Sequence, residues 1–291
     1  MQIALHLGAN CTDEDRILKS LLKNAETFSD YGIKVPGPGK YRRLIRETIQ
    51  NLNGAAPAPD THNILLDAIL DDEAADRLIM SNANFICIAN RIFDEGVFYQ
   101  QAEAKIHAFH QLFPEDEIEL FLALRNPATF LPAVFSQSKA DSPATYLKGL
   151  DPTQIRWSDL IRRIQHVVPL TKLTVWCNED TPLIWAEVLR AMSGVDQHQR
   201  ITGGFDLLAS IMSPEGMNRF LNYMRAHPPK TEEQKQRIIG AFLDKYALDD
   251  EVEEDIEMPG MTEEMFEHLT AIYDNDVAFI EQLPGVTFIA P

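Results

Sequence analysis

The sequence has few of the features that place a protein outside the cell or in a membrane. Its three cysteines, Cys11, Cys87 and Cys177, lie far apart and form no CxxC pair, which disfavours a disulfide framework or a structural zinc site. No apolar run approaches the ~18–20 residues that cross a bilayer. Met1 leads directly into a short mixed segment without basic residues, so we predict no signal peptide. These absences predict a cytoplasmic protein with reduced thiols.

Positive charge is also scarce. The chain has 26 Lys and Arg residues against 44 Asp and Glu residues, for a formal net charge of −18 at pH 7. Such a surface repels nucleic-acid phosphates and anionic lipid, which argues against both as main partners. Segment 249–257 holds seven acidic residues in nine positions. We interpret it as a solvated loop or helix end, with a docking site for a basic protein partner as the alternative.

The remaining composition is that of a folded chain with a core, because 45% of its 291 residues are hydrophobic. Short apolar segments predict strands, and segments with helical periodicity lie between them. This alternation predicts an α/β protein, with a central parallel sheet in a three-layer α/β/α arrangement. We expect one domain over 1–291, in which 195–291 is mainly a helical C-terminal extension. The predicted strands are 2–7, 77–81, 118–124, 173–177 and 285–289.

The segment after the first predicted strand has an unusual composition. Thr12 is a candidate N-cap for a helix over 12–27, and Asp13, Glu14 and Asp15 would then lie in its first turn, where the helix dipole favours acids. The same three carboxylates could instead hold a divalent cation. A thiol at a helix N-terminus, here that of Cys11, gains reactivity, although the carboxylates oppose this effect.

Three segments resemble a known family. Residues 5–15, LHLGANCTDED, are similar to the L-H-I-G-x-x-K-T-G-T-T opening of bacterial sulfotransferases. Residues 31–36, YGIKVP, resemble the family's G-[IV]-x-Y-P segment, and residues 122–127, LALRNP, resemble its strand-plus-arginine element. The resemblance covers roughly residues 1–180. It implies the P-loop sulfotransferase fold and sulfuryl transfer from 3′-phosphoadenosine 5′-phosphosulfate to a small hydroxylated acceptor.

The resemblance also implies a set of nucleotide-binding residues. Arg125 matches the arginine that holds the 3′-phosphate, and Thr12 is the hydroxyl that the phosphate loop retains. Ser136 lies one turn beyond Ala133, the position of the family's serine. His6 corresponds to a framework histidine, which we interpret as a core residue or, as the alternative, a general base.

The phosphate loop departs from the family pattern. Cys11 replaces the signature lysine, Asp13 replaces a glycine, and Glu14 and Asp15 replace hydroxyl residues. Each carboxylate near a bound phosphate costs about 1–4 kcal/mol, depending on screening. Three hypotheses therefore remain: sulfuryl transfer, binding of another ligand, and a catalytically inactive binding or regulatory protein.

Two further groups are candidates for binding. The basic cluster of Lys40, Arg42, Arg43 and Arg46 is either a solvated helix start or an anion site that assists the nucleotide. The adjacent acids 179 and 180 follow a predicted strand, at the edge where α/β proteins bind ligands, but 180 or 181 could simply cap the next helix. We predict no metal site, because the histidines at 107 and 110 have no third ligand in view.

Overall fold

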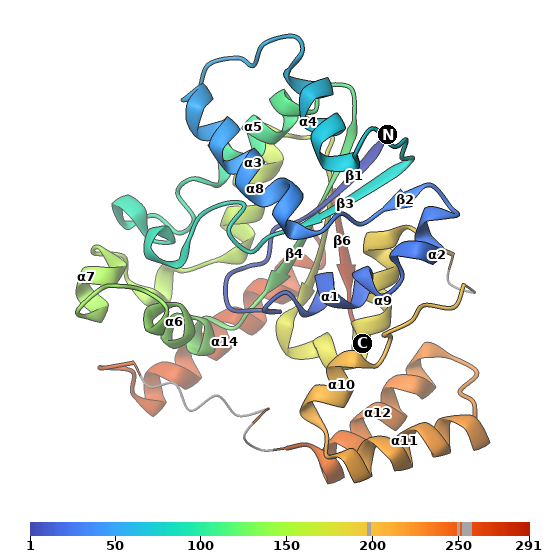
Figure 1. The fold of residues 1–291 in the computed structure, drawn as a ribbon. Helices are drawn as coiled ribbons and strands as arrows, with labels where there is room; N and C mark the ends of the chain where they lie inside the picture. Colours follow the sequence, from blue (N-terminus) through green and yellow to red (C-terminus); the bar gives the residue numbers. More distant parts are fainter. Residues whose placement is uncertain (197–198, 249–250, 252–257) are drawn as a thin grey trace.

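The structure is a computed structural model that describes residues 1–196, 199–248, 251 and 258–291. Its centre is one six-stranded sheet in the order β2-β3-β1-β4-β5-β6, and every neighbouring pair is parallel (Figure 1). Helices cover both faces, which confirms the predicted α/β/α architecture. The strands are β1 (Gln2–His6), β2 (Ile33–Lys34), β3 (Arg77–Ser81), β4 (Glu117–Leu124), β5 (Lys172–Cys177) and β6 (Val286–Ile289).

Five of these strands coincide with the predicted apolar segments to within a residue. The exception is β2, which was not predicted because a two-residue strand carries no periodicity. The longer helices of the first part of the chain are α3 (Pro38–Leu52), α4 (Thr61–Leu70), α5 (Ala102–Leu112), α6 (Pro127–Ser136), α8 (Trp157–Val167) and α9 (Thr181–Ser193). They are followed by α10 (Asp206–Ile211), α11 (Pro214–Ala226), α12 (Glu232–Tyr246) and α14 (Glu263–Ile280).

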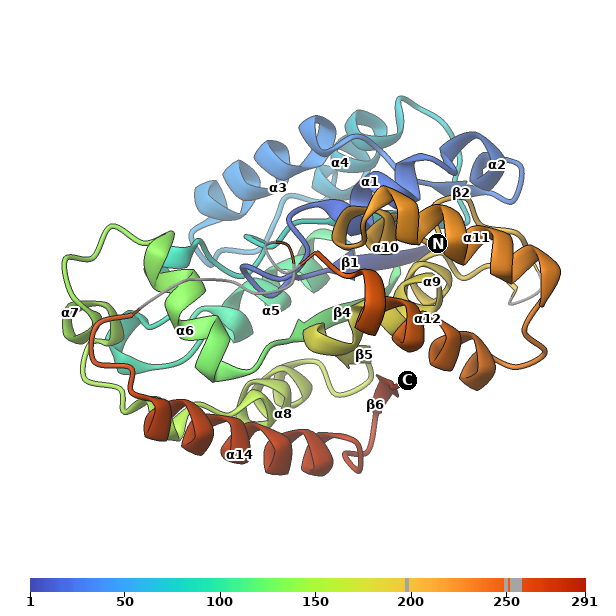
Figure 2. The ribbon, with the colours of Figure 1, turned by 90° about the horizontal axis from the view of Figure 1, so that it is seen from below.

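Alternating side chains of the strands divide the core into two halves. On β1, Ile3 and Leu5 pack into the larger half, together with α3, α4, α5, α6, α8 and α14. Ala4 faces the other half, with α9, α10, α11 and α12. Figure 2 shows the two groups of helices on opposite sides of the sheet. The helix after β1 packs into the same half as Ala4, through Ile17, Leu18 and Leu21, whereas α6, after β4, packs into the larger half. In open parallel sheets, ligands bind at the carboxyl ends of neighbouring strands whose helices lie on opposite faces.

The first predicted helix is wrong in its bounds. The structure has two short helices, α1 (Arg16–Leu22) and α2 (Ala25–Ser29), in place of one helix over 12–27. Thr12 is not the N-cap, because its hydroxyl donates to the Ala9 carbonyl at 2.7 Å. Asp15, in the left-handed conformation with φ 64°, precedes α1 instead. No acidic residue lies in the first turn.

Helix α3 begins at Pro38, directly after Gly37 in the extended conformation. Proline at the first turn is compatible with a helix, since its missing N–H would have no partner within the helix there. The basic cluster is thus in the first three turns of α3.

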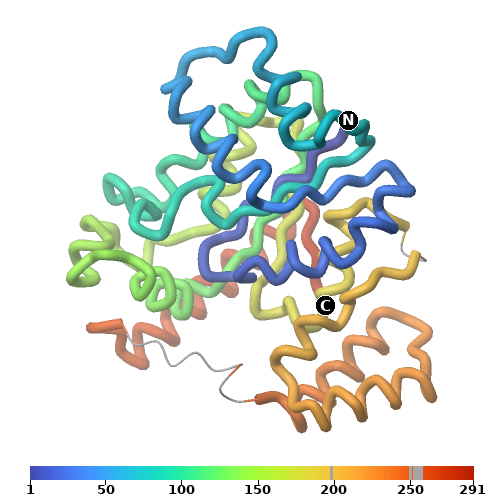
Figure 3. Tube along the Cα trace, in the orientation of Figure 1, coloured from blue at the N-terminus to red at the C-terminus, as the bar shows by residue number. Residues whose placement is uncertain are grey.

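The C-terminal part leaves the sheet after β5 and returns to it. Helices α10, α11 and α12 lie on one face, α14 packs against α6 and α8, and β6 pairs with β5. The tube in Figure 3 shows that the chain ends beside the sheet. Of the acidic segment 249–257, all but Glu251 lies outside the described residues. No helix within the described ranges is long and apolar enough to span a membrane.

Candidate functional site

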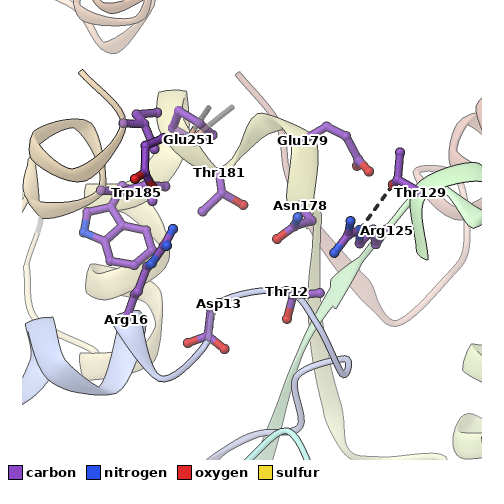
Figure 4. A pocket seen from close by; sticks show the side chains of 13 residues that line it. Thr12, Asp13, Arg16, Arg125, Thr129, Asn178, Glu179, Thr181, Trp185 and Glu251 are labelled. Atoms are coloured by element: carbon purple, nitrogen blue, oxygen red, sulfur yellow. Dashed lines mark hydrogen bonds between the residues drawn. The ribbon is translucent and has the colours of Figure 1, made fainter. Parts of the chain in front are cut away.

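A cavity of about 290 Å³ lies at the carboxyl ends of β1, β4 and β5. This size is near the lower end of the ~300–1,000 Å³ typical of small-molecule sites. Figure 4 shows Arg16 and Trp185 on one side of the cavity, and Arg125 and Thr129 on the other. The described residues that line it are Thr12, Asp13, Arg16, Arg125, Thr129, Asn178, Glu179, Thr181, Pro182, Trp185, Leu207, Ile211 and Glu251.

The loop after β1 is held firmly against β4. The Ala9 amide donates to the Ala123 carbonyl at 3.3 Å, and the Ala123 amide donates to the Gly8 carbonyl at 2.6 Å. Asn10 is fixed by Tyr99, whose hydroxyl accepts from the Asn10 amide at 3.1 Å. Gly8 has φ 97°, and a Cβ there would meet the backbone of Ala83 at 3.0 Å. The loop therefore presents its residues to the cavity from a rigid base.

The N-terminus of α1 is occupied by the chain's own carboxylate. One oxygen of Asp13 accepts from the Ile17 amide at 3.1 Å, and the Asp13 carbonyl accepts from the Arg16 amide at 2.8 Å. Asp13 is buried, with 8% of its surface exposed. In a phosphate loop, amides at this position would bind the phosphate. Asp13 takes the place of that anion.

Arg125 extends from the end of β4 into the wall of the cavity. Its Nη1 donates to the Cys11 carbonyl, and its Nε donates to the Thr129 hydroxyl at 3.2 Å. Only 4% of its surface is exposed. Arg125 thus ties the β1 loop to α6 and places a positive charge at the cavity. Thr12 lines the same cavity, so the structure brings together two of the predicted nucleotide-binding residues.

Arg16 supplies the second cation of the cavity, from the first turn of α1. Its nearest carboxylate among the described residues is Glu14, at 3.8 Å. Its side chain is 39% exposed. Arg16 was not among the predicted site residues, because a lone arginine within the predicted helix over 12–27 gives no sign of the direction in which its side chain points.

Residues between β5 and α9, and the first residues of α9, form another part of the cavity lining. Glu179 accepts from the Asn126 amide at 2.8 Å and from the Tyr273 hydroxyl at 3.0 Å, so both of its oxygens bind protein groups. Neither Asp180 nor Thr181 caps α9 with its side chain. Burial and the nearby Glu179 raise the pKa of Asp180. The Thr181 hydroxyl is buried and has no hydrogen-bond partner among the described residues.

The basic cluster on α3 lies outside this cavity. Arg42 forms a two-pronged ion pair with Asp15, including a 2.9 Å bond, and also donates to the Ser81 carbonyl at 3.0 Å. The Arg42 hydrogen bond lowers the pKa of Asp15. Lys40 pairs with Asp71. Arg43 and Arg46 contact Glu47, at 2.7 and 3.8 Å. Each cation of the cluster therefore has a carboxylate partner within the chain.

Ser136 and His6 are also absent from the cavity lining. The Ser136 hydroxyl donates to the Ala133 carbonyl at 2.7 Å, at the far end of α6. His6 is fully buried, shares a 2.8 Å hydrogen bond with Ser81 and stacks on Trp176. Burial lowers the pKa of His6. This environment is that of a core histidine.

Within the described part of the chain, no group of three or more His, Cys, Asp or Glu residues is arranged to hold a metal ion. Asp13 instead accepts a hydrogen bond from the Ile17 amide, and Asp15 pairs with Arg42.

Comparison of the chain with models of known families, with curated proteins and with solved structures found no match. The fold and the cavity together define a class: an α/β/α protein with a ligand-sized cavity at the carboxyl edge of its parallel sheet. The resemblance to bacterial sulfotransferases remains a prediction from the sequence.

Proposed function

We propose that the protein binds a small organic anion with a single negative charge, such as an organic sulfate or carboxylate, in the cavity between β1, β4 and β5. The observation that carries this proposal is the position of Arg125. Its buried guanidinium lines the cavity beside the hydroxyls of Thr12 and Thr129. A guanidinium is suited to anionic oxygens, whereas the Thr12 and Thr129 hydroxyls already donate to the Ala9 and Asn126 carbonyls.

The charges around the cavity favour a monoanion over a nucleotide. Among the described residues, two arginines share the lining with three carboxylates, Asp13, Glu179 and Glu251. Asp13 and Glu179 accept backbone hydrogen bonds, which hold both carboxyl groups in place. A bisphosphate, with about four charges, would meet repulsion that a sulfate monoester or a carboxylate largely avoids.

The phosphate loop gives a second reason to prefer binding over sulfuryl transfer. Cys11 cannot neutralise a leaving group as a lysine would, and the Asp13 carboxylate already accepts a hydrogen bond from the Ile17 amide of α1. The proposal therefore corresponds to the alternatives of another ligand or an inactive binding protein. Transfer of a sulfuryl group from 3′-phosphoadenosine 5′-phosphosulfate is the less favoured hypothesis.

Titration of the protein with butyl sulfate, monitored by NMR or calorimetry, tests the proposal. We expect Arg125→Gln to weaken binding about tenfold or more, since hydrogen bonds to charged groups contribute about 1.5–3 kcal/mol. Arg16→Ala should weaken it less, because Arg16 lies on the opposite side of the cavity. Arg43→Ala, which removes an exposed cation of α3, is the matched control and should leave affinity unchanged.

Adenosine 3′,5′-bisphosphate distinguishes the two ligand hypotheses. The proposal expects it to bind more weakly than butyl sulfate. Tighter binding that depends on Arg125 would instead favour the nucleotide expectation. Affinity for butyl sulfate that is equal in wild-type protein and Arg125→Gln would contradict the proposal.

A further inference from the structure

One wall of the cavity is apolar. Pro182 and Trp185 from α9, and Leu207 and Ile211 from α10, line it together with the polar residues of the strand ends. Trp185 is on the side opposite Arg125 (Figure 4). Each of Trp185, Leu207 and Ile211 is buried, with 2%, 8% and 6% of its surface exposed.

Hydrogen bonds hold this wall in position. The Asp206 carboxylate at the start of α10 accepts from the Ser20 hydroxyl at 2.6 Å and from the Lys23 ammonium at 2.7 Å, which fastens α10 to α1. The Trp185 indole donates to the Gly203 carbonyl at 3.0 Å. The apolar surface is therefore a fixed part of the cavity, and no rearrangement is needed for a ligand to use it.

Thr181 lies between the polar and apolar parts of the lining. It is 6% exposed, and its hydroxyl has no protein partner within the described residues. A buried hydroxyl without a partner loses free energy relative to one that is hydrogen-bonded. A polar atom of a bound ligand would supply this partner at the start of α9.

We propose that the ligand of this cavity is amphiphilic: its anionic group lies at the Arg125 side, and an aliphatic or aromatic body lies against Trp185, Leu207 and Ile211. This inference rests on the proposed binding of a small organic anion and specifies its chemical class. It excludes inorganic anions and fully hydroxylated sugars as the preferred ligands, because neither would remove the apolar wall from water.

A series of alkyl sulfates, from methyl to hexyl, tests the inference on the wild-type protein. Each added methylene that is buried should strengthen binding about three- to fourfold, until the cavity is full. The corresponding alkyltrimethylammonium ions carry the same chains with the opposite charge, and we expect them to bind far more weakly.

Variants on α10 test whether the dependence of affinity on alkyl chain length arises from the apolar wall. Leu207→Ala should reduce the gain per methylene while leaving the affinity for methyl sulfate close to that of wild type. Leu208→Ala is the matched control, because Leu208 is a buried leucine of the same helix that does not line the cavity. It should keep the wild-type gain per methylene, and thermal melting of both variants would confirm that they fold.

The outcomes separate the two proposals. If no alkyl sulfate binds, or if the ammonium series binds equally well, the proposed anion-binding function is wrong. If all alkyl sulfates bind with the same affinity, or if Leu207→Ala keeps the wild-type gain, anion binding stands and the amphiphilic ligand class is overturned.

Discussion

Asp13 shows at the scale of one residue how the β1 loop differs from a phosphate loop. Its carboxylate accepts from the Ile17 amide and so caps α1 from inside the cavity wall. Loss of a capping oxygen costs about 1 kcal/mol. We expect Asp13→Ala to lower the free energy of unfolding by about this amount, measured by urea denaturation.

The same substitution should strengthen anion binding, because it removes a negative charge and exposes the α1 amides to the cavity. The control is Glu14→Ala, since the Glu14 side chain is 70% exposed and caps nothing. Unchanged stability in Asp13→Ala, or a loss as large in Glu14→Ala, would contradict the capping role.

At the scale of elements, a partly buried charged cluster joins α9 to α12. Lys235 of α12 pairs with Glu187 of α9 at 3.2 Å and with Glu232. Burial and the neighbouring Glu232 raise the pKa of Glu187 to about 7. Since its ordinary value is 4.5, the folded protein binds more protons here than the unfolded chain between these two values. The contribution of Glu187 to stability therefore falls as pH rises through this window.

Because the contribution of Glu187 to stability falls with rising pH, the packing of α12 on α9 should weaken as pH rises. Glu187→Gln cannot ionise, so between about pH 5 and pH 8 it should lose less stability than wild type, by about 1–2 kcal/mol after allowance for solvent screening. Thermal melting across this range measures the difference. Glu233→Gln, with a side chain that is 72% exposed, should behave like wild type. If the melting temperatures of wild type and Glu187→Gln change in parallel with pH, the raised pKa of Glu187 is refuted.

At the scale of the whole molecule, the stability of the sheet depends on the return of the chain from α14 to β6. β6 pairs with β5 from Leu173 to Trp176 and covers what would otherwise be an open strand edge. Deletion of 286–291 should lower the melting temperature by at least several degrees and promote aggregation, because unpaired edges recruit other strands. Deletion of 290–291 alone is the control, since it leaves β6 intact. Equal melting temperatures for the two deletions would show that β6 is dispensable.

Local sequence was sufficient to predict the longer strands and their alternation with helices. The apolar run before Arg125 is long enough to show a buried strand by itself, and the alternation of strands and helices predicts a parallel sheet. Glu179 followed from the same pattern, because parallel strands bring their carboxyl ends to one edge, whereas Thr12 and Arg125 were expected from the resemblance to bacterial sulfotransferases.

Only the tertiary structure decided which of these residues share a cavity and what completes it. Leu207 and Ile211 are far from Thr12 in sequence, and only the packing of α10 on α1 brings them to the same site. Likewise, the α3 cations were plausible anion ligands until their partners were seen: the Arg42 guanidinium is bound by Asp15 and Ser81. Periodicity reports whether a residue is buried, whereas the partner it meets depends on contacts between distant segments, which no local pattern encodes.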